Sequence, residues 1–255
     1  MTAKVYLIGA GPGDPDLITR KGLRLIKEAD VIIYDRLIPQ ELLGEASPGT
    51  ELINAGKAPT KHRLSQDEIN ETILRKARRG KVVVRLKGGD PLVFGRGSEE
   101  ALVCYEHGIP FEIVPGISSS YAVPAYAGIP LTHREISRSF TVITGHTADD
   151  INYEALAGIG GTLVILMGVK SLPVLVERLI LAGLDPETPA ASIEWGTIEA
   201  QRVIEANIID LPQKALQADL QAPAITVIGE VVRLRAEGVR WFDLLPETIF
   251  QERAV

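Results

Sequence analysis

A single carboxylate lies inside a glycine-rich turn of the sequence. The run Lys87-Gly88-Gly89-Asp90-Pro91 directly follows an apolar stretch. Gly88 and Gly89 can adopt positive φ, so the backbone can approach a small molecule closely. Asp90 can then accept hydrogen bonds from a ligand's ammonium or hydroxyl groups, and Pro91 stiffens the exit of the turn. A tight structural turn is the alternative, and for this run alone it is the better interpretation.

A second turn of the same kind follows the first apolar run, where a dinucleotide-binding fold places its phosphate turn. In Gly9-Ala10-Gly11-Pro12-Gly13-Asp14-Pro15 the third glycine of that motif is replaced by Asp14, whose charge would compete with a pyrophosphate. Pro12 and Pro15 also remove two backbone donors. The loop therefore favours a cationic or neutral ligand. Asp35 stands about 20 residues further on, where a dinucleotide-binding motif has its ribose-binding acid. A flavin or nicotinamide oxidoreductase therefore stays a distant alternative.

Hydroxyl groups form a third candidate binding element. Ser118, Ser119 and Ser120 follow Gly116 at the start of a predicted helix, where hydroxyl and free N–H groups could meet a ligand's carboxylate. Capping of the helix is the structural alternative, and the two roles are compatible. The histidines have no metal-ligand spacing, and no G-x-S-x-G motif is present, so we expect neither a metal site nor a hydrolase.

The composition limits the class of protein. Of the 255 residues, 45% are hydrophobic, which is ample for one large domain or two ordinary ones. Cys104 is the only cysteine, which excludes an internal disulfide and fits a reducing cytoplasm. No apolar run approaches the ~20 residues that span a bilayer. The net charge of -6, with no basic block, argues against a nucleic-acid partner.

Strand-like apolar runs alternate with helical ones, which predicts an α/β protein with largely parallel sheets. Strands are predicted over residues 5–9, 31–35, 51–54, 81–86 and 111–114, and then over 139–143, 162–167, 190–194, 202–205 and 224–229. A helix is predicted over 65–79, because Ser65 and Glu68 have capping-box spacing. Another is predicted over 171–182.

The stretch from residue 115 to 130 is rich in Gly, Pro, Ser and Ala, which is typical of a crossing between subdomains. We therefore predict an N-terminal α/β lobe over residues 1–115 that carries the glycine-rich loops and the candidate acid and base. A hinge over 116–138 and a C-terminal α/β lobe over 139–255 complete the chain. A ligand cleft is expected between the two lobes.

In this order, the segments resemble the tetrapyrrole methylase family. The resemblance rests on Gly9–Pro15, Tyr34–Leu37, Gly56–Lys57, Arg85–Pro91, Phe94–Gly97, Val114–Ser119 and Gly128–Arg134, with weaker matches at Leu166–Gly168 and Glu194–Thr197. Each motif alone is modest evidence, but the ordered set is specific and extends over nearly the whole chain. The resemblance implies two α/β lobes that bind S-adenosylmethionine in the cleft between them, with no metal.

The resemblance also implies roles for individual residues. The S-adenosylmethionine pocket would be lined by Pro12, Gly88, Gly89, Asp90, Val93, Ser118, Ser119, Met167 and Gly196. Met167 is a candidate for this pocket only because of the resemblance, since a methionine after an apolar run is more often part of a core. Asp35 falls where the family places its proton acceptor and Lys57 where it places its donor. The family usually has an arginine after that lysine, whereas this chain has Ala58.

The activity implied is the C-methylation of uroporphyrinogen III at two ring carbons, which gives precorrin-2 by way of precorrin-1 for sirohaem or cobalamin synthesis. S-adenosylhomocysteine is the by-product. Asp35 would remove a proton if partial burial raised its pKa, although a solvated ion pair with Arg36 explains this carboxylate equally well. The acceptor carries eight carboxylates, so local basic clusters are expected. They are Lys57, Lys61, His62 and Arg63; Lys87 and Arg96; and His133, Arg134 and Arg138.

Among the cations, Arg36, Arg96 and Arg134 lie inside matched loops and are the preferred carboxylate ligands. The family resemblance further implies a homodimer, and we expect no fused dehydrogenase and chelatase module. Three other hypotheses stay open besides the oxidoreductase. They are a methyltransferase for a later corrin-pathway intermediate, a non-catalytic tetrapyrrole carrier and, disfavoured by the acidic charge, a ribosomal-RNA methylase.

Overall fold

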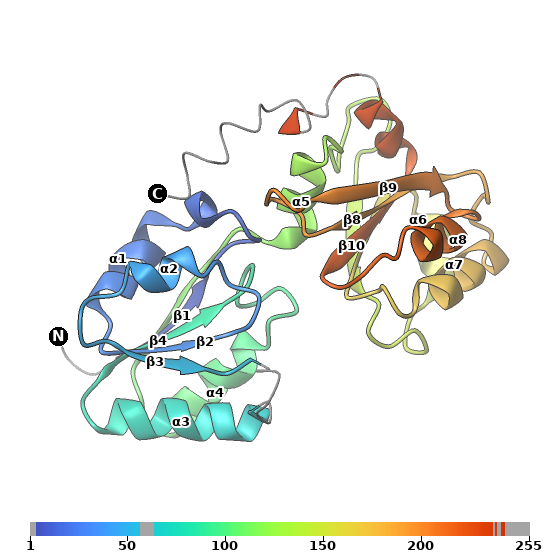
Figure 1. Ribbon diagram of the computed structural model, residues 1–255. Helices are drawn as coiled ribbons and strands as arrows, with labels where there is room; N and C mark the ends of the chain where they lie inside the picture. Colours follow the sequence, from blue (N-terminus) through green and yellow to red (C-terminus); the bar gives the residue numbers. More distant parts are fainter. Residues whose placement is uncertain (1–3, 57–63, 237, 239–240, 243–255) are drawn as a thin grey trace. The chain divides into compact units, whose positions relative to one another are not determined.

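The chain divides into two compact units, Met1–Ser118 and Ser119–Val255. The computed structural model in Figure 1 describes residues 4–56, 64–236, 238 and 241–242. Each unit contains one sheet with helices on both sides, so the prediction of two α/β lobes is confirmed. The division falls inside the segment 116–138. The ligand cleft expected between the lobes stays a prediction.

The sheet of the first unit is parallel throughout. Its order is β3-β2-β4-β1-β5. The strands are β1 (Lys4–Gly9), β2 (Val31–Tyr34), β3 (Glu51–Asn54), β4 (Val82–Lys87) and β5 (Phe111–Val114). All of these strands were predicted within one residue at each end. Every residue of β4 is buried, as expected for a central strand covered on both faces.

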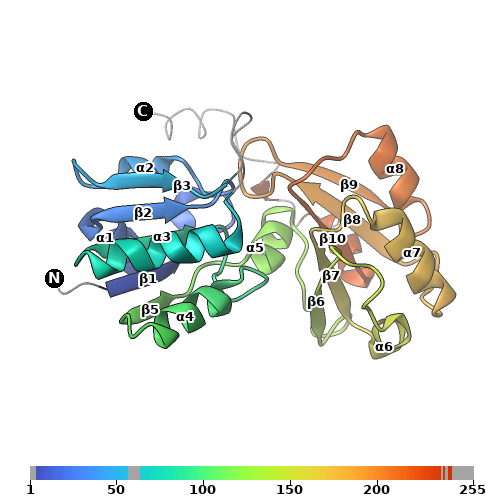
Figure 2. The same ribbon diagram turned by 90° about the horizontal axis from the view of Figure 1, so that it is seen from below.

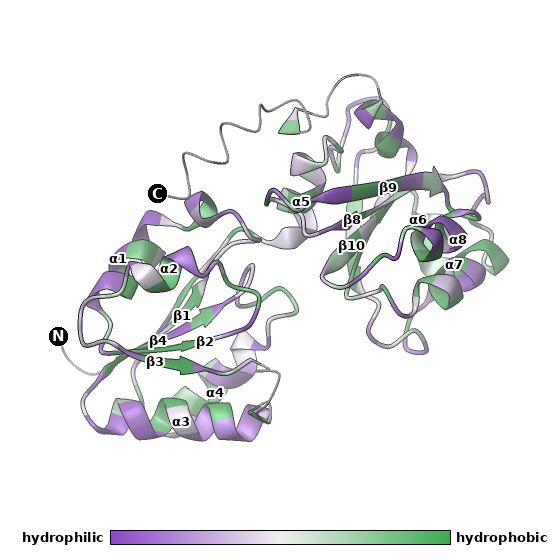
Figure 3. Ribbon diagram, in the orientation of Figure 1, coloured by the Kyte–Doolittle hydropathy of each residue, from purple (hydrophilic) through white to green (hydrophobic). Residues whose placement is uncertain are grey.

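Helices cover both faces of this sheet. Figure 2 shows α3 (Gln66–Arg78) and α4 (Gly97–Glu106) together on one face, whereas α1 (Arg20–Glu28) and α2 (Glu41–Gly44) cover the other. Alternate residues of the strands enter two apolar cores, so Val83 packs with α3 and α4 while Val84 packs with α1 and α2. Figure 3 shows the strands mostly green and the outer helix α3 partly purple.

The predicted capping box at the start of α3 is present. The amide of Glu68 donates to Oγ of Ser65 over 3.2 Å, and Oε2 of Glu68 accepts from the Ser65 amide over 2.6 Å. The apolar stripe of the helix, which includes Ile69 and Ile73, faces the sheet. The cap and the stripe together fix where α3 begins and which face it buries.

The sheet of the second unit is mixed, which corrects the expectation of largely parallel sheets. Its order is β6-β7-β10-β8-β9, and only the β6–β7 pair is parallel. The strands are β6 (Phe140–Thr144), β7 (Thr162–Leu166), β8 (Pro189–Glu194), β9 (Arg202–Asn207) and β10 (Ala224–Ile228). The short link from β8 to β9 has no crossover helix, so these strands pair as antiparallel neighbours.

Two apolar layers also flank the second sheet. One layer packs against α7 (Leu172–Leu181) and α8 (Leu211–Gln217), and the other against α5 (Ser119–Tyr126) and the short helix η2 (Glu230–Arg235). The helix α6 (Tyr153–Ile159) contacts α7. Within the described ranges, no helix combines the length and the apolar character needed to cross a lipid bilayer.

Candidate functional site

Three loops leave the first sheet at the same edge, because the strands that precede them, β1, β4 and β5, run parallel. Two of these loops are hydrogen-bonded to each other. The amide of Gly89 donates to the Gly11 carbonyl over 2.7 Å, and the amide of Gly11 donates to the Gly89 carbonyl over 3.3 Å. Pro12 follows this bridge directly. The structure therefore brings the two glycine-rich turns together.

Asp90 ties the third loop to the other two. Its Oδ2 accepts from the amide of Gly116 over 2.9 Å, and its Oδ1 accepts from the amide of Leu92 over 2.8 Å. Ser118 lies two residues after Gly116 and is buried. Asp90 thus has a structural role that the sequence analysis did not predict, and it holds the loop of Ser118 beside the loop of Gly88 and Gly89.

The loops approach so closely that only glycine fits at the contact. A Cβ atom on Gly9 would lie 2.4 Å from the carbonyl oxygen of Gly89 and 2.6 Å from Cα of Gly116. One on Gly116 would lie 2.3 Å from the same oxygen. Gly89 itself has a φ of 65°. The three loops therefore meet here through their backbones, and any side chain in place of these glycines would push the loops apart.

The first loop does not form a phosphate cradle. Asp14 is buried and caps the 3₁₀ helix η1 (Pro15–Leu17), because its Oδ1 accepts from the amide of Asp16 over 3.0 Å. The Asp14 carboxylate thus accepts a hydrogen bond from an amide at the start of the helix. A bound pyrophosphate would need donors of this kind. This arrangement agrees with the expectation of a cationic or neutral ligand.

The segment after Asp90 exposes apolar side chains and leads into α4. Val93 and Phe94 are exposed, and Phe94 and Arg96 have left-handed backbones with φ of 52° and 59°. The guanidinium of Arg96 donates to both carboxylate oxygens of Glu99, over 2.9 and 2.7 Å. The hydrogen bond with Glu99 raises the pKa of Arg96. The side chain proposed to bind acceptor carboxylates is thus already oriented by a carboxylate of its own chain.

Asp35 follows β2 and pairs with a buried arginine. The Nη2 atom of Arg85 donates to Oδ1 of Asp35 over 2.5 Å, and Nζ of Lys87 lies 3.9 Å from Oδ2. The alternative pairing with Arg36 is wrong, because the cation bound to Asp35 comes from β4 and Arg36 itself is exposed. Asp35 remains about one third exposed, so it stays accessible to a ligand.

The sequence analysis missed the buried cluster behind Asp35. Glu100 of α4 is fully buried, and its Oε1 accepts from Nε of Arg85 and Nζ of Lys87, both over 3.0 Å. Lys87 is 3% exposed and therefore does not serve as a surface ligand for acceptor carboxylates, which corrects that expectation. Arg85 and Lys87 in an otherwise apolar strand could have indicated this cluster, because buried cations need a buried acid as partner.

The pKa values of the two buried cations are shifted in opposite directions. Desolvation lowers the pKa of Lys87, and the positive charge of Arg85 lowers it further. Desolvation also acts to lower the pKa of Arg85, but the negative charges of Asp35 and Glu100 outweigh it, so the pKa of Arg85 is raised. Lys87 is therefore the cation of this cluster that gives up a proton more readily.

The candidate residues of the second unit lie at one end of its sheet. Met167 follows β7 and Gly196 lies two residues after β8, and both strands end opposite the start of β10. Met167 is 53% exposed with a φ of 56°, so it is not part of the core. A Cβ on Gly196 would lie 2.2 Å from Val123 of α5, which explains the glycine. Ser119 begins α5.

For the other predicted site residues within the described ranges, the structure shows no contact that indicates a role. Arg134 is exposed, and its carbonyl accepts from Nε of Arg138 over 3.4 Å. Lys57, together with Ala58 and the basic residues 61–63, lies outside the described residues. In the part of the chain that the structure describes, no three His, Cys, Asp or Glu side chains gather as a metal site would require.

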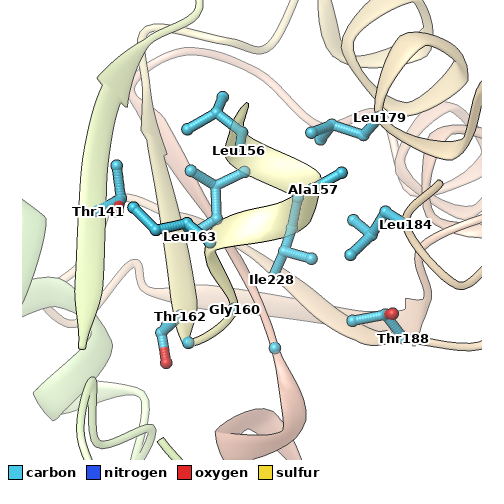
Figure 4. A pocket seen from close by; sticks show the side chains of 13 residues that line it. Thr141, Leu156, Ala157, Gly160, Thr162, Leu163, Leu179, Leu184, Thr188 and Ile228 are labelled. Atoms are coloured by element: carbon cyan, nitrogen blue, oxygen red, sulfur yellow. The ribbon is translucent and has the colours of Figure 1, made fainter. Parts of the chain in front are cut away.

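A cavity of about 40 Å³ lies in the second unit, between α6 and the sheet (Figure 4). It is lined by Leu156, Leu163, Leu179 and Ile228 among others. None of the predicted site residues lines it. The space accommodates only a few water molecules, so it does not compete with the loops as a ligand site.

The family model described as Tetrapyrrole (Corrin/Porphyrin) Methylases matches residues 4–212. The chain is 51% identical over 238 residues to the uroporphyrinogen-III C-methyltransferase of Methanocaldococcus jannaschii, covering 92% of this chain and 98% of that protein. It is 52% identical over 236 residues to the S-adenosyl-L-methionine-dependent uroporphyrinogen III methyltransferase of Methanosarcina barkeri, covering 91% and 92%.

A solved structure is also similar. The uroporphyrin-III C-methyl transferase of Thermus thermophilus, complexed with S-adenyl homocysteine, superposes with a TM-score of 0.78. It is 39% identical, and the match covers 91% of this chain and 94% of that one. The ordered loops, the two sheets and these matches lead to one assignment: the chain belongs to the tetrapyrrole methylases.

Proposed function

We propose that this protein transfers methyl groups from S-adenosylmethionine to two ring carbons of uroporphyrinogen III and so makes precorrin-2 for sirohaem or cobalamin synthesis. The observation that carries the proposal is the joining of the loops after β1, β4 and β5 through Gly11, Gly89, Asp90 and Gly116. The relatives named above act on the same acceptor, as their names state.

The donor fits the chemistry of the loops. A sulfonium compound is cationic, and the first loop carries Asp14 in place of the glycine that a phosphate requires. The glycine contacts hold the three loops together through their backbones. We assign the donor site to Pro12, Gly88, Gly89, Asp90, Val93, Ser118, Ser119, Met167 and Gly196. When bound there, the donor supplies an activated methyl group, and holding both substrates in line supplies most of the acceleration.

The protein's own side chains handle the acceptor and its protons. Methylation leaves a cation on the macrocycle, and Asp35 accepts the proton that the macrocycle loses to neutralise it, because Asp35 is the exposed carboxylate of the buried cluster. Arg36, Arg96 and Arg134 bind acceptor carboxylates, each through a planar fork of donors. Lys57 donates a proton in this scheme and lies outside the described residues.

Further parts of the proposal concern the whole protein. We infer a homodimer in the cytoplasm with no nucleic-acid or membrane partner. The single cysteine and the net charge of -6 support the compartment and the absence of a nucleic-acid surface. We also propose that residues 116–138 act as a hinge between the lobes 1–115 and 139–255.

An anaerobic incubation with both substrates, followed by mass spectrometry, tests the function. The acceptor should gain two methyl groups, and folded protein that leaves uroporphyrinogen III unchanged would refute the proposal. If instead only a later corrin intermediate gains a methyl group, the alternative acceptor is correct. Calorimetry with S-adenosylhomocysteine and with NADPH separates the methyltransferase from an oxidoreductase, because only the former should bind S-adenosylhomocysteine.

A further inference from the structure

Asp35 is held by two cations that share one buried acid. Oδ1 of Asp35 faces Nη2 of Arg85 and Oδ2 faces Nζ of Lys87. Behind them, Oε1 of Glu100 accepts from both cations. Arg85 and Lys87 lie two residues apart on β4 and so project from the same face of the sheet, toward α4. One helix residue therefore controls the position of both groups that flank Asp35.

The hydrogen bonds of Glu100 are unevenly distributed. Its Oε1 also accepts from Nε2 of Gln66 over 3.2 Å, whereas its Oε2 is buried and has no hydrogen-bond partner among the residues described. A buried carboxylate with one unpaired oxygen is costly, and apolar replacements of buried ion pairs are often neutral or stabilising. Stabilisation of the fold therefore explains the burial of Glu100 poorly. A role toward Asp35 explains it better.

We propose that Glu100 is a positioning residue for Asp35, which acts through Arg85 and Lys87 to orient that carboxylate and to offset the two positive charges beside it. This inference rests on the proton-accepting role proposed above for Asp35. With Glu100 ionised, the two acids balance the two cations. Without it, the two cations would act on Asp35 alone and would hold it as an anion that accepts a proton poorly.

Other titratable groups near the cluster are few within the described residues. Arg96 and Glu99 lie at the start of α4. The charge of Arg96 interacts with that of Glu100, and the charge of Glu99 interacts with that of Lys87. Asp67 of α3 acts on Arg96, and Cys104 lies one turn after Glu100. Arg96 and Glu99 largely offset each other because they are paired, so Glu100 is the acid that sets the charge around Arg85 and Lys87.

The test follows the titration of the Asp35 carboxyl carbon by ¹³C NMR, with the resonance identified by its loss in Asp35→Asn. Glu100→Gln keeps the size of the side chain and removes its charge, so the Asp35 midpoint should fall by about one pH unit. Lys87→Met removes a cation, and the midpoint should rise by a similar amount. Glu106→Gln removes an exposed charge from the same helix and should leave the midpoint unchanged.

Turnover provides the second readout. In Glu100→Gln the kcat should fall roughly tenfold while the KM for the donor is unchanged, since only the base is misplaced. An unchanged Asp35 midpoint in folded Glu100→Gln would overturn the inference, whatever the result for Lys87→Met. If Glu100→Gln fails to fold, Glu100→Asp replaces it, because the shorter side chain withdraws the carboxylate from Arg85 and Lys87; an unchanged Asp35 midpoint in that variant would overturn the inference. If Asp35→Asn turns over as fast as the wild type, the proposed role of Asp35 fails, and the NMR midpoints still report whether Glu100 acts on it.

Discussion

The backbone amide of Gly116 donates a hydrogen bond to Oδ2 of Asp90 across 26 residues of sequence, and this contact fixes the loop after β5 against the loop after β4. The same carboxylate holds Leu92 through Oδ1. Asp90 therefore orders the proposed donor site whether or not it also touches the donor.

The first prediction concerns this carboxylate. Asp90→Ala should lower the free energy of unfolding by about 1–3 kcal/mol, because two amides lose their acceptor. Its affinity for S-adenosylhomocysteine, measured by calorimetry, should fall at least tenfold, since about 1.4 kcal/mol of lost binding energy has that effect. Asp150→Ala removes an exposed carboxylate from the second unit and serves as the control. Wild-type affinity in Asp90→Ala would contradict the assignment.

The second prediction concerns the contact between glycines. Gly116→Ala places a Cβ atom 2.3 Å from the Gly89 carbonyl oxygen, so the loops must separate. We expect a loss of roughly 1–3 kcal/mol in the free energy of unfolding, together with loss of S-adenosylhomocysteine binding. Gly44→Ala is the matched control, because nothing lies within 4 Å of its Cβ position, and there alanine should be neutral or slightly stabilising. Chemical denaturation of both variants measures the difference.

The third prediction concerns pH. Hydrogen bonds from Lys21 and Lys4 lower the pKa of Glu112 from 4.5 to about 2. Because this pKa is depressed in the folded protein, the stabilisation is fully present above pH 4.5 and is lost as the pH falls toward about 2. Glu112→Gln should therefore lower the free energy of unfolding near neutral pH, by less than about 1 kcal/mol since the pairs are partly solvated. A difference from the wild type that did not shrink in acid would contradict this account.

The fourth prediction concerns the only thiol. Burial, with a smaller contribution from the charge of Glu100, raises the pKa of Cys104 to about 11. The side chain is fully buried between α4 and the sheet. In the native protein, iodoacetamide at about pH 8 should leave Cys104 unmodified, because thiolate and access are both lacking. After denaturation, mass spectrometry should show one adduct. Rapid alkylation of folded protein would show that α4 opens locally.

Local patterns in the sequence predict most of the strands. Runs such as Val31–Ile33 and Val82–Val84 are apolar and β-branched, so the strands and the loops that follow them were found. The capping box marked the start of α3 in the same way. These signals are local, and each involves residues within a few positions of one another.

Relations between distant segments were predicted less well. The direction of β10 relative to β7 and β8 depends on how the chain returns to the sheet, which no local pattern contains. Likewise, the partner of Asp35 lies 50 residues away in β4 rather than at the adjacent Arg36. The two glycine-rich turns meet because the parallel strands before them end at one edge of the sheet, and the clamp by Asp90 required the coordinates.

Strand β4 positions both the buried charge cluster and the glycine-rich turn that follows it, so a change in its length affects both. Its side chains Arg85 and Lys87 enter the buried charge cluster, and its last residue leads straight into the Gly88–Gly89 turn. Loss of one residue within the strand would exchange its inward and outward faces and would also retract the turn. Efforts to redesign acceptor preference should therefore keep the length of β4 constant and diversify exposed positions such as Arg36 and Arg134.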